Sequence, residues 1–126
     1  MLVKNVMLFV GISVLLFSHS SAVASGEDDI GQGENNYQAY CSPCHGANGD
    51  GKGDLGAALS TPPRNHTDAS IMSKRTDEQI FKTISLGGEA VGLAPDMPAH
   101  NTVIPEGEIR GLVKVIRRLC KCEYKK

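Results

Sequence analysis

Large aromatic side chains are scarce in this sequence of 126 residues. It contains no tryptophan, three tyrosines and three phenylalanines, and aromatic residues make up 5% of the chain. Two of the phenylalanines, Phe9 and Phe17, lie in an apolar segment near the N-terminus. Aromatic rings contribute much of the buried surface of most small domains. We therefore expect something other than aromatic side chains to fill the centre of this one.

The sequence also lacks a strong excess of either charge. Thirteen basic and fourteen acidic residues give a formal net charge of −1. A nucleic-acid-binding protein would usually present a strongly basic face, so we expect no nucleic-acid partner. Acidic residues gather at 27–29 and basic residues at 117–126. This distribution is typical of solvated chain ends, and docking to a charged partner protein is the alternative.

No apolar segment reaches the roughly 20 residues that a membrane-spanning helix needs. The segment 6–17 is apolar, follows Lys4 and is followed by an Ala-Val-Ala sequence that ends at Ala24. A basic start, an apolar segment of about 7 to 15 residues and such a site predict a secretory signal. We expect residues 1–24 to be a cleaved signal peptide and 25–126 to be one domain in the periplasm. An uncleaved signal anchor is the alternative.

Residues 41–45 read Cys-Ser-Pro-Cys-His. Two thiols at this spacing can each add to a vinyl group of one haem, and the histidine that follows can bind the iron. We therefore predict Cys41 and Cys44 as attachment sites and His45 as an axial ligand. A haem would also supply the missing core. A dithiol redox pair would leave His45 without a role, and a zinc site would need more ligands.

A second candidate iron ligand, Met97, lies in the segment 87–104, which contains three glycines and two prolines. A structureless loop of that length in a small domain usually serves binding. A thioether on such a loop can reach the second axial position of the iron. His66, His100 and Met72 are competitors. A single histidine is more often exposed or structural, and a methionine in or beside a short helix more often fills a core.

The helical signals begin near the haem-binding sequence. Residues 25–33 are rich in glycine and acidic residues and predict a flexible lead-in. Residues 34–40 predict a helix of about two turns, with Tyr37 and Tyr40 on one face. Pro43 should prevent this helix from continuing regularly.

Three further helical segments are predicted. Thr67 and Asp68 can cap a short turn over residues 69–72. The sequence Thr-Asp-Glu-Gln at 76–79 predicts a capping box that starts a helix stopped by Gly87. Pro105 suits the first position of the last helix. The apolar residues of that helix recur at spacings of three and four: Ile109, Leu112, Val113, Ile116 and Leu119.

The run GENNYQAYCSPCHGANGDGKG, residues 33–53, resembles the opening of a class I c-type cytochrome, and residues 94–98 resemble the methionine loop of that family. The resemblance covers nearly all of the predicted domain. It implies an all-α class I cytochrome c fold of about four helices with long loops around one covalently attached haem c. Such a protein is a soluble one-electron carrier, not an enzyme, and works in a respiratory or redox chain with donor and acceptor proteins.

The resemblance also assigns structural roles. It implies that Gly33 and Tyr37 lie where the first and last helices cross, and that a carbonyl of the proline-bearing segment 61–64 accepts the Nδ1 proton of His45. Which carbonyl does so stays open, and Arg64 could either lie near a haem propionate or be exposed. Val115 occupies the place where relatives commonly carry an aromatic residue, so other side chains must pack that crossing.

Three alternatives remain. If Met97 does not bind iron, the open haem face would suit a gas sensor or a peroxidase-like enzyme. The domain could also be the cytochrome subunit of a dehydrogenase or oxidase complex, which would then provide its contact with a membrane. Cys120 and Cys122 could form a local disulfide, form an intermolecular one or stay reduced; a four-thiolate zinc site with the haem-motif cysteines is disfavoured by the other motifs.

Overall fold

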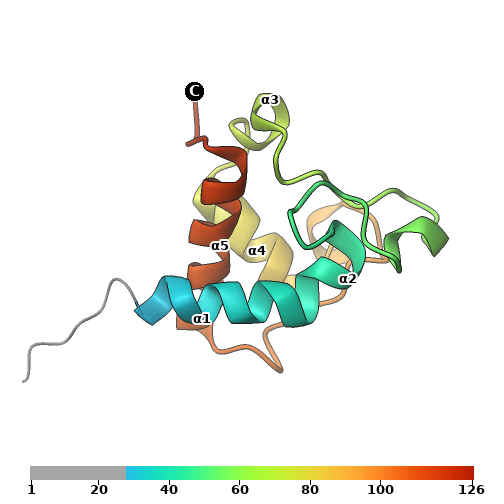
Figure 1. Ribbon diagram of the computed structural model, residues 1–126, viewed down its shortest axis with the longest axis horizontal. Coiled ribbons are helices and arrows are strands. Elements are labelled where there is room, and N and C mark those ends of the chain that lie inside the picture. Colours follow the sequence, from blue (N-terminus) through green and yellow to red (C-terminus); the bar gives the residue numbers. More distant parts are fainter. Residues whose placement is uncertain (1–27) are drawn as a thin grey trace, which may run out of the picture.

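The computed structural model describes residues 28–126, so the predicted signal peptide at 1–24 lies outside the described residues. The described chain is helical and contains no strand, which confirms the all-α prediction (Figure 1). None of its helices is long and apolar enough to cross a membrane. In chain order the elements are α1 (Asp28–Asn36), a π-helical turn (Tyr37–Cys41), α2 (Ser42–His45), a 3-10 turn (Gly56–Ala58), α3 (Ala69–Met72), α4 (Asp77–Leu86), a second 3-10 turn (Glu89–Val91) and α5 (Glu106–Cys120).

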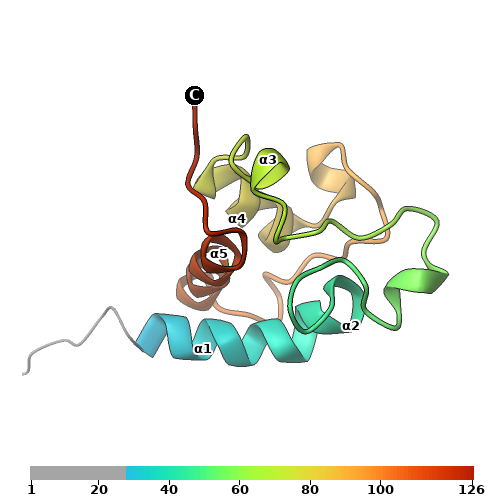
Figure 2. The ribbon, with the colours of Figure 1, turned by 45° about the horizontal axis from the view of Figure 1, so that its top comes forward.

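The first helix begins earlier than the sequence predicts. Residues 28–33 are helical rather than a flexible lead-in, because α1 crosses α5 and packs against it here (Figures 1 and 2). Gly33 lies against the backbone of Gly111 in α5, and the side chain of Asn36 donates a hydrogen bond of 2.7 Å to Glu108. Tertiary contacts of this kind stabilise a helix that its own propensities would not.

The first helix does not continue regularly to Pro43, as predicted, but the chain stays helical there. After α1 it makes the π-helical turn Tyr37–Cys41 and then continues as α2, with Pro43 near the start of the new helix. Proline is tolerated in the first turn of a helix because the amide hydrogen it lacks would have no partner there. π-Helical turns are rare and occur frequently at functional sites. The helical segment therefore runs through the whole Cys-Ser-Pro-Cys-His sequence.

Both short-range caps predicted downstream are present. Asp68 accepts a hydrogen bond from the backbone N–H of Ser70 at the start of α3. Thr76 and Gln79 form the reciprocal capping box at the start of α4, with bonds of 3.1 and 2.9 Å. Gly87 ends α4 with a φ of 82° as expected, although its ψ of 167° lies outside the left-handed helical region.

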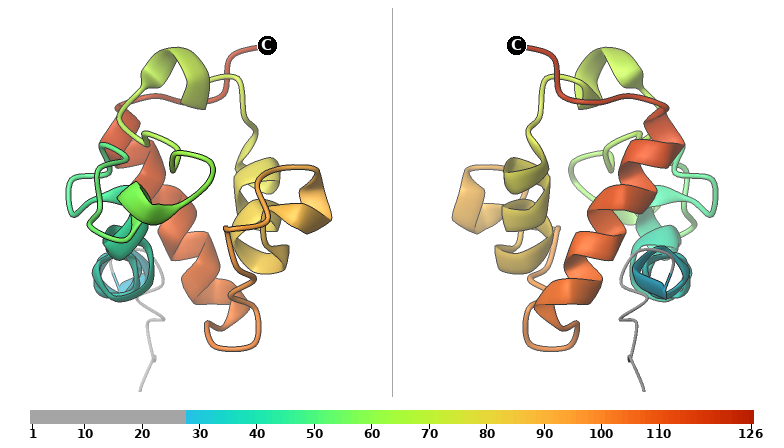
Figure 3. Two further views of the ribbon diagram at one scale, coloured as in Figure 1. Left: turned by 90° about the vertical axis from the view of Figure 1, so that its right-hand side faces the viewer. Right: turned by 90° about the vertical axis from the view of Figure 1, so that its left-hand side faces the viewer.

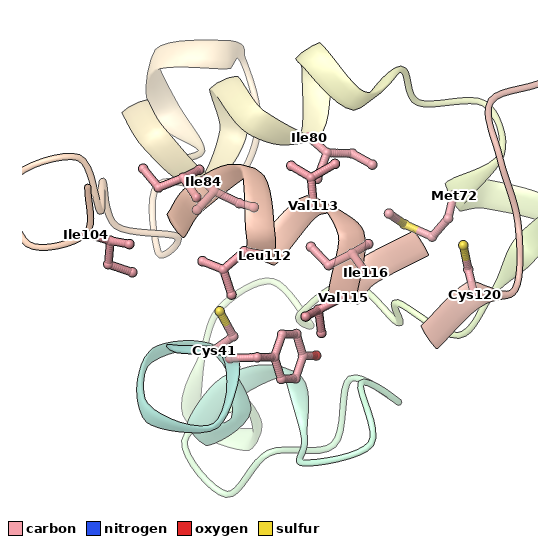
Figure 4. Packing of buried hydrophobic residues seen from close by; sticks show 12 residues of the cluster. Cys41, Met72, Ile80, Ile84, Ile104, Leu112, Val113, Val115, Ile116 and Cys120 are labelled. Carbon is pink, nitrogen blue, oxygen red and sulfur yellow. The ribbon is translucent and has the colours of Figure 1, made fainter. Parts of the chain in front are cut away.

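The last helix, α5, carries most of the core. It starts at Glu106, one residue later than predicted, because Pro105 is its N-cap. Figure 4 shows its apolar side chains directed toward α4 on one side and toward Cys41 on the other. Tyr37 and Val115 are each 1% exposed and belong to the same core cluster, so a tyrosine from the preceding helical segment helps to pack this part of α5.

A disulfide between Cys120 and Cys122 closes the C-terminal end of α5, which selects the local pairing among the alternatives. Between them, Lys121 adopts a left-handed conformation with φ 50° and ψ 42°. The N–H of Cys122 donates to the carbonyl of Arg117, and that of Lys121 to Arg118, which is the hydrogen-bond pattern of a Schellman motif. The tail then passes α3 (Figure 3), where the N–H of Lys125 donates to Ser73.

Candidate functional site

A cavity of about 320 Å³ opens between α2, α4, α5 and two long loops. The first loop, 46–68, joins α2 to α3, and the second, 87–105, joins α4 to α5. Its lining is mostly apolar, with Ile80, Ile84 and Ile116 from the helices and Pro62 and Pro63 from the first loop. All four residues predicted to hold a haem and its iron line this same cavity: Cys41, Cys44, His45 and Met97. Residues far apart in the sequence thus meet at one site.

Both cysteines of the Cys-Ser-Pro-Cys-His sequence are free thiols. Cys41 is the last residue of the π-helical turn and is buried, whereas Cys44 in α2 is partly exposed. Burial, with a smaller contribution from the neighbouring Cys44, raises the pKa of the Cys41 thiol to about 12. Both residues line the cavity as free thiols, the form that can add to a vinyl group.

The imidazole of His45 is oriented by a backbone carbonyl. Its Nδ1 lies 2.9 Å from the carbonyl oxygen of Arg64, so the nitrogen donates and Nε2 is left as the free ligand atom. Burial lowers the pKa of His45, although this hydrogen bond opposes the shift. A neutral imidazole is the form that binds a metal. The supporting carbonyl belongs to the predicted segment 61–64, but to Arg64 rather than to a proline.

His66 is buried beside His45, which is the structural rather than the exposed of the two places expected for a single histidine. The two imidazole rings are stacked, with centroids 4.2 Å apart and planes at 16°. Nδ1 of His66 is hydrogen bonded to the Tyr37 hydroxyl at 2.9 Å. Burial lowers the pKa of His66 to about 3, so the ring is neutral. Spacing in the sequence could not reveal this stack, because His66 lies beyond the local motif.

Met97 lies in the second long loop, far along the sequence from the two cysteines. Its carbonyl accepts a hydrogen bond of 2.9 Å from Gly88, and its N–H donates to Ala94 at 3.3 Å. The loop is also joined to the first loop, because the Ser60 hydroxyl donates a hydrogen bond of 2.7 Å to the carboxylate of Asp96. This bond connects the two long loops that border the cavity.

The remaining competitors for the iron also line the cavity. Met72 is 4% exposed and belongs to the hydrophobic core, as predicted. His100 is buried rather than exposed, packs edge-on against Tyr40, and its Nδ1 has no hydrogen-bond partner within residues 28–126. A buried polar atom without a partner suits a cavity that takes a ligand.

The donor set fits a haem better than a zinc ion. The Cys120–Cys122 disulfide removes two of the four thiolates that a zinc site would need. In the described part of the chain, no three His, Cys, Asp or Glu residues are grouped to hold a metal ion. Two free thiols, one imidazole and one thioether around an apolar cavity are instead the groups that bind a haem c through its vinyl groups and its iron.

Comparisons with known proteins agree with this chemistry. Residues 28–115 match the family described as cytochrome c oxidase, cbb3-type, subunit III. A solved c-type cytochrome, KustC0563, is 30% identical, with a TM-score of 0.56, over 69% of this chain and 95% of its own. A chain of the Kuenenia stuttgartiensis reducing HAO-like protein complex Kustc0457/Kustc0458 is 29% identical, with a TM-score of 0.57, over 70% of this chain.

This chain spans 41% of the length of that complex component, and no curated protein matches it significantly. The match to the family nevertheless covers most of the sequence, and the helical fold and the cavity are those expected of its members. The chain therefore belongs to the cbb3-type subunit III family of cytochrome c domains, and it is a class I c-type cytochrome, a haem-dependent electron carrier.

Proposed function

We propose that this protein is a soluble periplasmic one-electron carrier with a single haem c bound through thioethers to Cys41 and Cys44. His45 and Met97 are the axial ligands of the iron. The observation that carries the proposal is that these four side chains line one apolar cavity, with Nδ1 of His45 already bonded to the Arg64 carbonyl. That bond directs the imidazole to use Nε2 for the metal.

When bound, the haem supplies an iron that changes between the ferric and ferrous states. The residues of the chain then hold and insulate the cofactor. Methionine as an axial ligand raises the reduction potential relative to a second histidine, and burial in an apolar cavity has a similar effect. With both axial positions filled by His45 and Met97, no position is left for a substrate, and the protein carries electrons without catalysing bond chemistry.

Export supports the same proposal. The sequence at 1–24 has the basic start, apolar segment and Ala-Val-Ala site of a secretory signal. The disulfide at Cys120 and Cys122 is also typical of an oxidising compartment such as the periplasm. Donor and acceptor are proteins of a respiratory or redox chain.

A spectrum of the exported protein, combined with a pyridine haemochrome assay, tests the proposal. Two thioether bonds and a low-spin iron with histidine and methionine ligands should give a haem c haemochrome and the weak red absorption band of iron–methionine ligation. A haem c protein without that band, whose reduced form binds carbon monoxide rapidly, would instead be an open-site sensor or peroxidase. A colourless protein would contradict haem binding altogether.

A second candidate function, the cytochrome subunit of a larger redox complex, is favoured by two of the comparisons. The family is named for an oxidase subunit, and one similar structure is a component of a complex. Purification from the native cell separates the two possibilities. A subunit held by charged contacts should co-purify with its complex at low salt and dissociate at high salt, whereas a free carrier should elute as a monomer in both.

A further inference from the structure

The stacked pair of His45 and His66 has a geometric consequence for the iron site. The hydrogen bond from Nδ1 of His45 to the Arg64 carbonyl holds one atom of the imidazole at 2.9 Å. A single contact of this kind leaves the ring free to tilt about the bonded nitrogen. The face of the His66 ring, 4.2 Å away and within 16° of parallel, occupies the space into which the His45 ring would tilt.

His66 is itself held in place by two hydrogen bonds. Its backbone N–H donates a hydrogen bond of 2.6 Å to the Gly49 carbonyl, and its ring nitrogen Nδ1 is bonded to the hydroxyl of Tyr37 at 2.9 Å. Tyr37 is 1% exposed and His66 is 7% exposed, so both rings are packed inside the protein. Gly49 fits tightly over both, because a Cβ at that position would lie 3.1 Å from the Tyr37 hydroxyl and 3.3 Å from the His66 Cβ.

We propose that His66 is a positioning residue that fixes the plane of the His45 imidazole, with Tyr37 holding His66 in place. This inference rests on the proposed role of His45 as an iron ligand. In this proposal His66 does not bind the iron, and its flat ring limits the tilt of the His45 imidazole. The sequence alone made His66 a competitor for the iron, whereas the stack indicates a positioning role.

The plane of an axial imidazole determines how unpaired electron density is distributed over the four pyrroles of ferric haem. The proton NMR shifts of the four haem methyl groups of the oxidised protein therefore report the plane directly, and a purely structural role for His66 would leave their pattern unchanged. His66→Leu removes the flat ring, His66→Phe keeps a flat ring without the hydrogen bond, and Tyr37→Phe removes only the hydroxyl.

We expect His66→Leu to change the order or the spread of the four methyl shifts and to shift the largest g value in electron paramagnetic resonance. Tyr37→Phe should change them in the same direction to a smaller extent, and His66→Phe, which keeps a flat ring but loses the same hydrogen bond, should resemble Tyr37→Phe rather than His66→Leu. The matched control is Val113→Ala, which removes buried volume from α5 at a residue that does not line the cavity. It should lower stability and leave the pattern unchanged.

Wild-type methyl shifts in both His66→Leu and Tyr37→Phe would overturn the proposal. If His66→Leu does not accumulate as a haem protein, an unchanged pattern in Tyr37→Phe overturns it alone. These outcomes differ from a failure of the proposed function, which would appear earlier, as an exported wild-type protein without haem or without a histidine-ligated iron.

Discussion

Gly33 of α1 lies against the backbone of Gly111 of α5, so closely that a Cβ on Gly33 would be 2.7 Å from the Gly111 carbonyl carbon and oxygen. Two glycines facing each other allow the helix backbones to approach without a side chain between them. Tyr37, four residues after Gly33, is buried beside α5, and its hydroxyl is hydrogen bonded to His66. The helix crossing and the side chain beside His45, the proposed haem ligand, are therefore parts of one packing arrangement.

The first prediction concerns this contact. Gly33→Ala should separate α1 from α5 and lower the free energy of unfolding by roughly 1–3 kcal/mol, as expected for overpacking of a tight interior. Urea unfolding of the haem-loaded protein measures it. Gly31→Ala is the matched control in the same helix, because a Cβ there meets nothing within 4 Å. It should raise stability by up to about 1 kcal/mol through helix propensity; equal effects of the two substitutions would contradict the prediction.

The second prediction concerns the proposed methionine ligand. Met97→Ala should remove the red iron–methionine band, lower the midpoint potential and allow carbon monoxide to bind the reduced iron. Absorption spectroscopy and redox titration measure these changes. Met72→Leu is the control, since Met72 also lines the cavity and should leave all three properties unchanged.

One outcome of that substitution has a defined follow-up. If Met97→Ala stays low-spin, another side chain has occupied the iron, and His100 is the histidine that follows it by three residues in the same loop. The Met97→Ala, His100→Ala double variant would then become high-spin. An intact red band in Met97→Ala itself would show that Met97 is not the ligand.

The third prediction concerns the bond between the two loops. Ser60→Ala removes the hydroxyl that bonds Asp96, the residue before Met97, and should make it easier for the methionine loop to open. An exposed hydrogen bond to a carboxylate contributes about 1 kcal/mol, so added imidazole should displace the methionine with an affinity about fivefold higher. Spectral titration with imidazole measures this affinity. Thr61→Ala removes a hydroxyl at the next position and should bind imidazole like the wild type.

The fourth prediction concerns the end of α5. Lys121 adopts positive φ, a conformation that costs a residue with a side chain roughly 1–2 kcal/mol and glycine much less. Lys121→Gly should therefore stabilise the disulfide-bonded protein by up to about 1 kcal/mol in thermal or urea unfolding. Lys114→Gly, within the same helix, should destabilise it by about 1 kcal/mol or more. Destabilisation by both substitutions would contradict this interpretation of Lys121.

Signals that lie within a few residues of each other were predictable from the sequence. The capping box at Thr76 and Gln79 depends on neighbouring side chains and is present as predicted. The same holds for the period of α5 and for the loop that carries Met97. The identity of the axial ligands remains a prediction, although the cavity brings the expected residues together.

Features that depend on distant contacts were not predictable. The early start of α1 results from packing on α5 at Gly33, and the stack on His45 joins residues 21 apart in the sequence. The carbonyl that supports His45 had several equally suitable neighbours, and only the path of the loop selects Arg64. The alternatives for Cys120 and Cys122 were likewise decided by the turn at the end of the helix.

The disulfide has a consequence for how the protein matures. If Cys41 and Cys44 bond to haem as proposed, they must escape oxidation until the cofactor arrives, while the C-terminal pair must be oxidised. The C-terminal ring spans a sequence separation of two, so it can close in the unfolded chain before any long-range contact forms. Assembly thus requires two of the four cysteines to stay reduced until haem attachment while the other two are oxidised. A disulfide between one cysteine of each pair would block both reactions.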